Sequence, residues 1–191
     1  MRWGRAEVTW GFCLVAAWIN YLDRQRIFPL ALAACALHEL GHYVAIRCLG
    51  GDVKQIRLTA VGAEMTLDRP LSYAGEGAAA LAGPGVNLMT ALALSLWGRG
   101  WTFAGINLVL GCFNLLPVSV MDGGRALACT LALLAGPEAA GRVGETLDRA
   151  FTAAMLACGL LLAGAWGNIT MLLAALWLSV LFWRRKRERR K

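Results

Sequence analysis

"CALHELGHYVA", from Cys35 to Ala45, places two histidines and a glutamate inside an otherwise apolar stretch. Burying such polar groups costs free energy unless each one finds a partner. His38 and His42 are four residues apart, so a helix would project both from one face, with Glu39 beside the first. This spacing is typical of two zinc ligands and a general base. A pair of core histidines next to a carboxylate is the alternative, but ionisable groups are costly in an apolar span.

The composition excludes an ordinary water-soluble domain. Of the 191 residues, 58% are hydrophobic and only 16% are charged, and the mean hydropathy is +0.55. Soluble domains rarely have so few charges. The six cysteines form no Cys-x-x-Cys pair and nearly all lie in or beside apolar runs. We therefore expect them to be small packing residues in a membrane, with no disulfide framework and no thiolate zinc site.

Six apolar runs follow one another along the chain, and a helix of about 20 residues crosses a bilayer. The runs occupy about 8–22, 28–49, 73–97, 101–136, 151–166 and 169–183. We predict an all-α polytopic membrane protein with about six transmembrane helices in a single domain, 1–191. Its core covers about 28–136 and two extra spans occupy about 151–183. The first run has no small-residue cleavage site after it and is expected to be a retained anchor.

The basic residues are distributed unevenly across this predicted topology. One side receives the N-terminus, most of the loop arginines and the tail "RRKRERRK" at 184–191, whereas the other keeps only Arg24, Arg26 and Arg99. The positive-inside rule then places both termini in the cytoplasm, and we expect a bacterial cytoplasmic membrane. The tail supplies most of the net charge of +7. It could bind nucleic acid, but directly after a span we expect it to contact anionic lipid instead.

The polar segment 51–70, between the second and third runs, alternates apolar and polar residues. The period is two over 56–60 and again over 64–67, with a turn expected at Gly62 and Ala63. This pattern predicts a small membrane-associated β-hairpin. An ordinary amphipathic loop is the alternative.

A catalytic zinc site takes three protein ligands and keeps a fourth position open, so one more oxygen or nitrogen donor is needed inside the membrane. Glu76 and Asp122 are the acidic residues in apolar surroundings. Asp122 is favoured, because Pro117 interrupts the helix before it and a Gly-Gly pair follows it, which suits a chain lining a polar cavity. Asp122 could also simply cap a helix at this break.

At this point the residues resemble a known family. "HELGH", followed about eighty residues later by "NLLPVSVMDGG", resembles the two signatures of the site-2 protease family of intramembrane zinc metalloproteases. Asn114, Pro117, Asp122 and Gly123 match the family's Asn-x-x-Pro-x-x-x-x-Asp-Gly pattern in spacing and identity, and "GPGVN" at 83–87 resembles the Gly-Pro-x-x-Asn element of its third core span. The resemblance implies one Zn2+ per chain on His38, His42 and Asp122.

The resemblance also implies roles for other residues and partners. Glu39 would activate the attacking water, and Asn114 would lie near the metal and contact substrate, with a helix–helix hydrogen bond as the alternative. Asn87 would be a second substrate-binding residue, or would serve packing around Gly83. The hairpin and the two extra spans resemble the sporulation-type branch, similar to stage IV sporulation protein FB, whose known member trims a membrane-bound sigma-factor precursor.

Proteolysis inside a membrane implies particular partners. A transmembrane substrate shields its peptide bonds by its own hydrogen bonds, so it must unwind locally, and a strand edge could hold the unwound part. We expect membrane lipids, a single-span or membrane-associated protein substrate and an inhibitory membrane partner, with oligomers allowed. Two other classes stay open: a catalytically silent scaffold or chaperone of the same fold, and a metal transporter, which would repeat polar residues through several spans.

Overall fold

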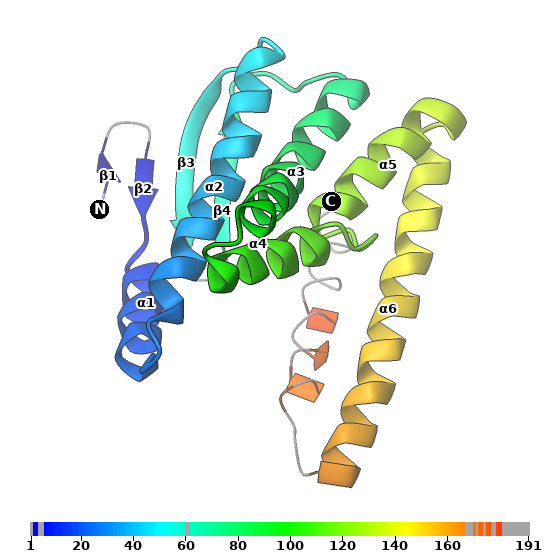
Figure 1. The fold of residues 1–191 in the computed structure, drawn as a ribbon. Coiled ribbons are helices and arrows are strands. Elements are labelled where there is room, and N and C mark those ends of the chain that lie inside the picture. The colour runs from blue at the N-terminus through cyan, green and yellow to red at the C-terminus, as the bar shows by residue number, and fades with distance from the viewer. Residues whose placement is uncertain are drawn as a thin grey trace.

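The computed structural model describes residues 2–3, 6–59, 62–166, 170, 172–173, 175–176 and 179–180. Within these residues the chain forms six helices and four strands, whose arrangement in space is drawn in Figure 1. The helices are α1 (Trp10–Leu22), α2 (Ile27–Cys48), α3 (Tyr73–Trp97), α4 (Trp101–Asn114), α5 (Asp122–Ala135) and α6 (Pro137–Trp166). The strands are β1 (Arg2–Trp3), β2 (Ala6–Val8), β3 (Val53–Thr59) and β4 (Gly62–Leu67).

Helix α3 is the centre of the helical assembly, because it packs against α2, α4 and α5. Helix α6 packs against α5, on the far side from the sheet (Figure 1). Gly41 permits the close approach of α2 to α3: a Cβ there would lie 2.8 Å from the carbonyl oxygen of Ala82 and 2.9 Å from a methyl group of Val86. Small residues at a helix crossing allow such contact between backbones.

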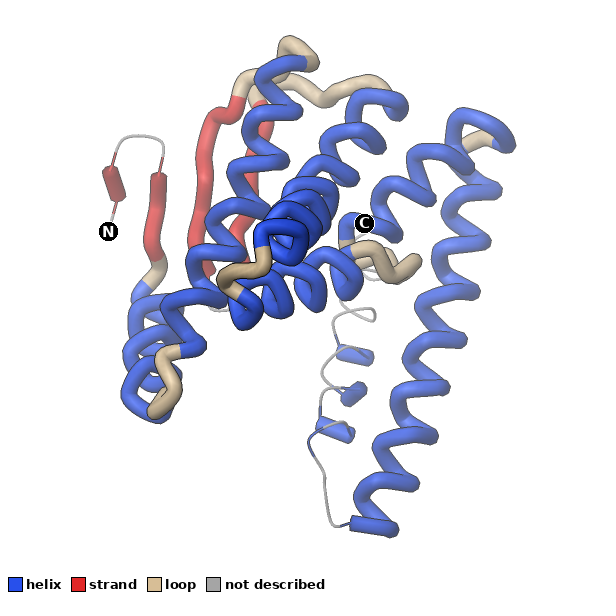
Figure 2. The backbone as a smooth tube through the Cα atoms, in the orientation of Figure 1, coloured by secondary structure: helices blue, strands red, loops and turns tan. Residues whose placement is uncertain are grey.

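The four strands form one sheet in the order β1-β2-β3-β4, alongside the helices (Figure 2). The predicted hairpin is confirmed: β3 and β4 are antiparallel, with Leu58 opposite Ala63 and Ile56 opposite Met65. The turn expected at Gly62 and Ala63 is wrong, because both residues belong to β4 and Thr59 pairs with Gly62. Strands β1 and β2 were not anticipated; β2 lies parallel to β3.

An apolar cluster attaches the hairpin to the helices. Ile46 of α2 and Ala79 of α3 are buried with Val53 of β3. Because apolar and polar residues alternate along the strands, one face of the hairpin contributes to this cluster while the other stays polar. The partly buried residues packed against it are Ala45, Ile56, Met65, Leu67 and Leu71.

Among the described residues, three helices are long and apolar enough to cross a bilayer: Ile27–Cys48, Tyr73–Trp97 and Pro137–Ala165, whereas α1 and α4 are shorter apolar helices. The expectation of six spans is not confirmed. The run at 101–136 is not one span but two helices, α4 and α5, because the chain leaves helical geometry between Asn114 and Asp122, around Pro117. The first extra span begins earlier than expected, at Pro137. The second extra span, at about 169–183, lies largely outside the described residues, and the tail at 184–191 lies wholly outside them.

Candidate metal centre

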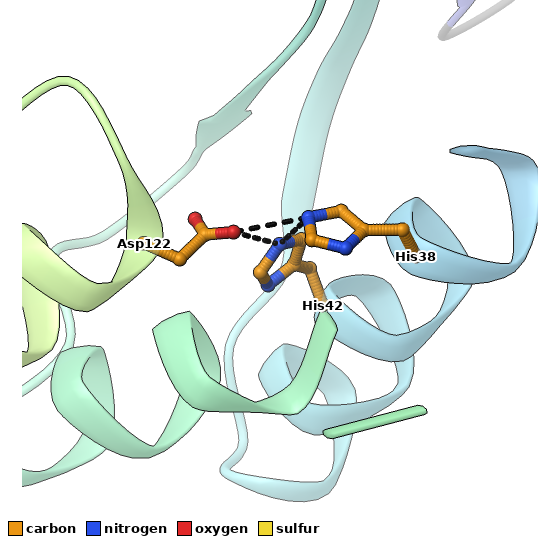
Figure 3. Close-up of side chains that lie close together, drawn as sticks. All are labelled: His38, His42 and Asp122. Carbon is orange, nitrogen blue, oxygen red and sulfur yellow. Dashed lines mark hydrogen bonds and ion pairs between the residues drawn. The ribbon is translucent and has the colours of Figure 1, made fainter. Parts of the chain in front are cut away.

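Two histidines of α2 project from the same face of the helix, as their spacing predicted (Figure 3). Their rings lie edge to face, with centroids 4.6 Å apart, and the two Nε2 atoms are 3.0 Å apart. His38 is only 6% exposed. The helical spacing therefore brings one nitrogen of each ring to a common point inside the helical assembly.

Asp122 completes the group from a different part of the chain. It is the first residue of α5, after the N-cap Met121. Its Oδ2 lies 3.0 Å from His38 Nε2 and 3.2 Å from His42 Nε2 (Figure 3). Asp122 is therefore not the helix cap that the sequence left open as an alternative, because Met121 is the N-cap and Oδ2 of Asp122 faces the two imidazoles.

The other nitrogen of each imidazole is held by a hydrogen-bond acceptor. His42 Nδ1 lies 2.7 Å from the carbonyl oxygen of Ala79, and His38 Nδ1 lies 2.6 Å from Oδ1 of Asn87. Since both partners are acceptors, each Nδ1 carries the proton, and each Nε2 presents a lone pair to the common point. Such outer partners orient metal-binding histidines and select their tautomer.

The arrangement fits a metal ion. Two Nε2 lone pairs and a carboxylate oxygen converge with no donor among them, which is unfavourable unless a cation lies between them. Tetrahedral ligands about 2.0–2.1 Å from zinc lie about 3.3 Å from one another, close to the separations of 3.0–3.2 Å found here. Within the described residues, this is the one group of three or more His, Cys, Asp or Glu side chains that could hold a metal. Three protein ligands leave a fourth position open, as in catalytic zinc sites.

The backbone around Asp122 explains the Gly-Gly pair that follows it. A Cβ on Gly123 would overlap the backbone of Leu115, and one on Gly124 would overlap the backbone of Val118. The loop from Leu115 to Met121 therefore folds directly over the first turn of α5. Asp122, the first residue of this turn, faces the two histidines of α2.

The same loop is tied to α6. Ser119 donates its backbone amide to Oδ1 of Asp148 over 2.8 Å and its hydroxyl to Oδ2 over 2.6 Å. Two hydrogen bonds to one carboxylate hold the loop in a single orientation. Sequence reasoning missed Asp148, because nothing near it in the chain resembles a site motif.

Gly83 of α3 lies directly against His42. A Cβ at this position would overlap the imidazole, with Nε2 the nearest atom. "GPGVN" was singled out in the sequence, and the structure shows what its first glycine does: it leaves space for the ring of His42, one of the three side chains that could hold a metal.

Glu39 follows His38 on α2 and is partly buried. Its carboxylate interacts electrostatically with His38, His42 and Asp122, and among the described contacts it makes no hydrogen bond or ion pair. A carboxylate beside the convergent ligands, not bonded to any of them, is available to bind a proton from water.

The two asparagines expected to contact substrate differ in their surroundings. Asn114 is half-buried, and its Nδ2 donates to the carbonyl oxygen of Leu110 in its own helix, 3.0 Å away; its substrate role stays a prediction. Asn87 has no exposed surface, and its oxygen faces His38. The contacts of Asn87 thus argue against substrate binding and for positioning, because its polar atoms are all bonded within the protein.

A separate cavity of about 630 Å³ lies between α3, α5 and α6. Its lining includes Pro117, Ser119 and Gly124 of the Asp122 loop and first turn, together with Asp148 of α6. Glu39, His38, His42 and Asp122 do not line it. The metal centre therefore lies outside this cavity.

Comparisons with known proteins point to one family, although no family model matches the sequence. A zinc metalloprotease of Methanocaldococcus jannaschii is 29% identical over 161 residues, which cover 78% of this chain and 46% of that protein. Rip3 of Mycobacterium tuberculosis, whose name assigns it to the same class, is 30% identical over 175 residues, covering 81% of this chain and 42% of Rip3. The chain thus spans less than half the length of these curated relatives.

A solved structure resembles the fold as well. The site-2 protease from Methanocaldococcus jannaschii superposes with a TM-score of 0.65 and 26% sequence identity, covering 91% of this chain and 86% of that one. The chain is thus similar in sequence to zinc metalloproteases and in fold to a site-2 protease, and its His-His-Asp group lies at the two motifs.

Proposed function

We propose that the protein is an intramembrane zinc metalloprotease that hydrolyses peptide bonds of membrane-embedded protein substrates. The observation that carries this proposal is the convergence of His38 Nε2, His42 Nε2 and Asp122 Oδ2, with the unbonded carboxylate of Glu39 beside them. The similar zinc metalloproteases and the site-2 protease structure support zinc as the metal and peptide-bond hydrolysis as the reaction class. Long apolar helices support a location within the bilayer.

The residues of the site have different roles in the proposed reaction. Zn2+, when bound by His38, His42 and Asp122, supplies a Lewis acid that polarises the scissile carbonyl and activates water. The carboxylate of Glu39 accepts the proton of the attacking water and returns it to the leaving amide nitrogen. Asn114 donates its remaining amide hydrogen to the substrate backbone. Ala79 and Asn87 keep the Nδ1 protons of both histidines in place, so that neither imidazole turns away from the site.

Within the family, we infer the sporulation-type branch, because a hairpin lies between α2 and α3 and a long apolar helix, α6, follows Asp122. The substrate would be a single-span or membrane-associated protein, held in check by an inhibitory membrane partner. The excess of basic residues on one side supports cytoplasmic termini. An epitope placed at each terminus and probed with a protease in sealed inverted vesicles tests that orientation.

The test of the reaction separates proton transfer from metal binding. In Glu39→Gln, cleavage of a single-span substrate should fall about 10²–10⁴-fold, the range for loss of a general acid–base group, while bound zinc stays at one per chain. In Asp122→Ala, both zinc and cleavage should be lost, because two histidines alone hold zinc weakly. Zinc is measured by elemental analysis of purified protein and cleavage by gel shift in membranes. Cleavage that survives in Glu39→Gln would overturn the assignment of the base.

We also propose that an unwound substrate segment pairs with β4. Strand β3 is enclosed by β2 and β4, so among the described strands the hairpin offers its free edge at β4. Backbone pairing at a strand edge is sequence-tolerant and suits an extended substrate. A proline at Leu58 would break the enclosed strand β3, so the informative positions lie in β4.

A proline scan over 63–66 tests this pairing. Amides of successive edge-strand residues point alternately to the partner strand and outward. Prolines at outward positions should reduce cleavage while zinc content and the thermal unfolding temperature stay near those of the unsubstituted protein. Equal loss of cleavage and zinc at all four positions would contradict substrate pairing at this edge.

A further inference from the structure

Two buried asparagines form a chain of hydrogen bonds that ends at His38. Asn87 of α3 and Asn107 of α4 are both 0% exposed. Asn87 Nδ2 lies 2.8 Å from Asn107 Oδ1, and Asn87 Oδ1 lies 2.6 Å from His38 Nδ1. A hydrogen-bonded row of side chains thus runs from α4 through α3 to the first histidine of α2. Asn107 was not singled out from the sequence.

Only one orientation of the two side-chain amides satisfies all of these hydrogen bonds. Asn107 Nδ2 lies 2.9 Å from the carbonyl oxygen of Phe103, which can only accept, so Asn107 turns its own oxygen toward Asn87. Asn87 Nδ2 then donates to Asn107 and, over 3.2 Å, to the carbonyl oxygen of Ala34. The oxygen of Asn87 is left to face His38, where it accepts the Nδ1 proton. The two backbone carbonyls therefore determine the tautomer of the imidazole.

From this geometry we propose that Asn107 is a positioning residue for zinc, acting through Asn87 on the tautomer and orientation of His38. The inference rests on the proposed zinc site and adds a residue on α4 to its support. If Asn87 turned its amide over, its Nδ2 would face His38 Nδ1 and favour the tautomer with the proton on Nε2. That tautomer has no lone pair at the atom that faces Asp122 and His42, and it cannot bind the metal there.

Asn107 contributes to this choice because it uses one of the two Asn87 amide hydrogens. Without Asn107, only the carbonyl oxygen of Ala34 would accept a hydrogen bond from Asn87 Nδ2 and hold the amide in its present orientation. That bond, at 3.2 Å, is longer than the 2.8 Å bond to Asn107. Leucine has the same branching and number of side-chain heavy atoms as asparagine but no acceptor, so Asn107→Leu removes the bond to Asn87. We expect about a 10-fold loss of zinc affinity, the lower end of the range for outer partners of metal ligands, and a larger loss for Asn87→Leu.

The experiment uses the full chain in detergent micelles and the metals themselves as probes. Zinc affinity is measured by competition with a chromophoric chelator, and the ligand field by the visible absorption of the Co2+-loaded protein. The variants are Asn107→Leu, Asn87→Leu and the double variant. Thr90→Val is the matched control, because Thr90 also bonds a carbonyl of its own helix, that of Val86, 2.8 Å away, and has no link to His38. Circular dichroism reports whether each variant folds.

If Asn107 acts through Asn87, its substitution should have no further effect once Asn87 is gone. The double variant should then match Asn87→Leu within about twofold, since independent sites would instead add. The Co2+ spectrum should change in Asn107→Leu and stay unchanged in Thr90→Val. Zinc affinity in Asn107→Leu equal to that of the control would overturn the proposal, as would full additivity in the double variant.

A second substitution covers the case in which Asn107→Leu does not fold. In Asn107→Ser the hydroxyl can still donate to the Phe103 carbonyl, as serines in helices do, but it is too short to accept from Asn87. The same loss of affinity is expected, and unchanged affinity would overturn the proposal. These readouts do not depend on proteolysis. Failure of unsubstituted protein to bind zinc would contradict the metal site itself, whereas tight binding that is insensitive to Asn107 would contradict only this inference.

Discussion

The two halves of the metal centre are positioned in different ways. The histidine half depends on hydrogen bonds between buried groups, since each Nδ1 is held by an acceptor on α3. The aspartate half depends on the path of the backbone, since Gly123 and Gly124 allow the Leu115–Met121 loop to lie on the first turn of α5. The position of the histidines should thus be disturbed by the loss of a hydrogen-bond acceptor, and the position of Asp122 by the addition of a Cβ atom to a neighbouring glycine.

Gly83 shows that the contrast is not absolute, because it supports a histidine by leaving space. Among substitutions that leave the three ligands in place, the strongest expected effect is that of Gly83→Ala. The new methyl group would overlap the His42 ring at Nε2, so the ring must rotate away or α2 must move off α3. Zinc affinity should fall by about 100-fold or more, the upper end for changes around a metal ligand. Zinc competition in micelles measures it.

The control for Gly83→Ala is two residues away on the same helix. A Cβ on Gly85 would meet no atom within 4 Å. Gly85→Ala should keep the zinc affinity of the unsubstituted protein and could stabilise α3 by up to about 1 kcal/mol through helix propensity. Similar zinc losses in both variants would mean that α3 tolerates no alanine here, and the specific contact with His42 would lose its support.

A smaller effect is expected from removing the hydrogen bonds between the Leu115–Met121 loop and Asp148 of α6. Asp148→Ala removes both hydrogen bonds from Ser119, each to a charged acceptor. The free energy of unfolding should fall by about 1.5–3 kcal/mol, the range for one hydrogen bond to a charged group, because Ser119 is partly buried and water can replace the other bond. Zinc affinity should fall by less than about 10-fold because the loop still rests on α5. Thermal unfolding and zinc competition measure the two quantities.

Two variants sharpen this prediction about Asp148. Asp148→Asn can still accept from the Ser119 amide and interact with its hydroxyl, so it should recover most of the loss. Glu138→Ala removes another carboxylate from α6, one whose side chain is 91% exposed, and should change neither quantity. If Asp148→Ala affects zinc as strongly as Gly83→Ala, the aspartate half depends on side-chain bonds as much as the histidine half does.

The smallest expected effect lies at the start of α2, away from both halves. Asp23 accepts hydrogen bonds from the backbone amides of Phe28 and Gln25, 2.6 and 3.2 Å away. The Phe28 amide is the main cause that lowers the pKa of Asp23 below its ordinary value of 3.8. A lowered pKa in the folded state stabilises the protein above the ordinary value, and this stabilisation is lost as the pH falls through the lowered pKa.

Asp23→Asn tests this in metal-free protein, so that histidine protonation does not interfere through zinc release. Unsubstituted protein should unfold at a slightly higher temperature than Asp23→Asn near neutral pH, and the difference should shrink below pH 3.8. A difference that grows at low pH would contradict the sign. Zinc affinity at neutral pH should be the same in both proteins, because the carboxylate is remote from the ligands.

The sequence was most informative where one short segment carries its own geometry. The helical spacing of His38 and His42 already predicts a shared face, and alternation over 53–67 predicts the hairpin. Its limits appear where contacts join distant segments. Asn107 and Asp148 have no local signature, because the hydrogen bonds that give them roles run to α3 and to the Asp122 loop. The helix count also depended on where Pro117 divides a continuous apolar run.

The sequence by itself determined the chemistry available to this protein: two imidazoles and a carboxylate at helical spacing, and an aspartate between a proline break and two glycines. Only the tertiary structure decided which atoms of those residues meet. Crossing helices and a folded loop bring Asp122 within 3.0–3.2 Å of both Nε2 atoms. Buried acceptors on α3 then select the tautomers, because an imidazole chooses its protonated nitrogen by its neighbours and not by its position in the chain.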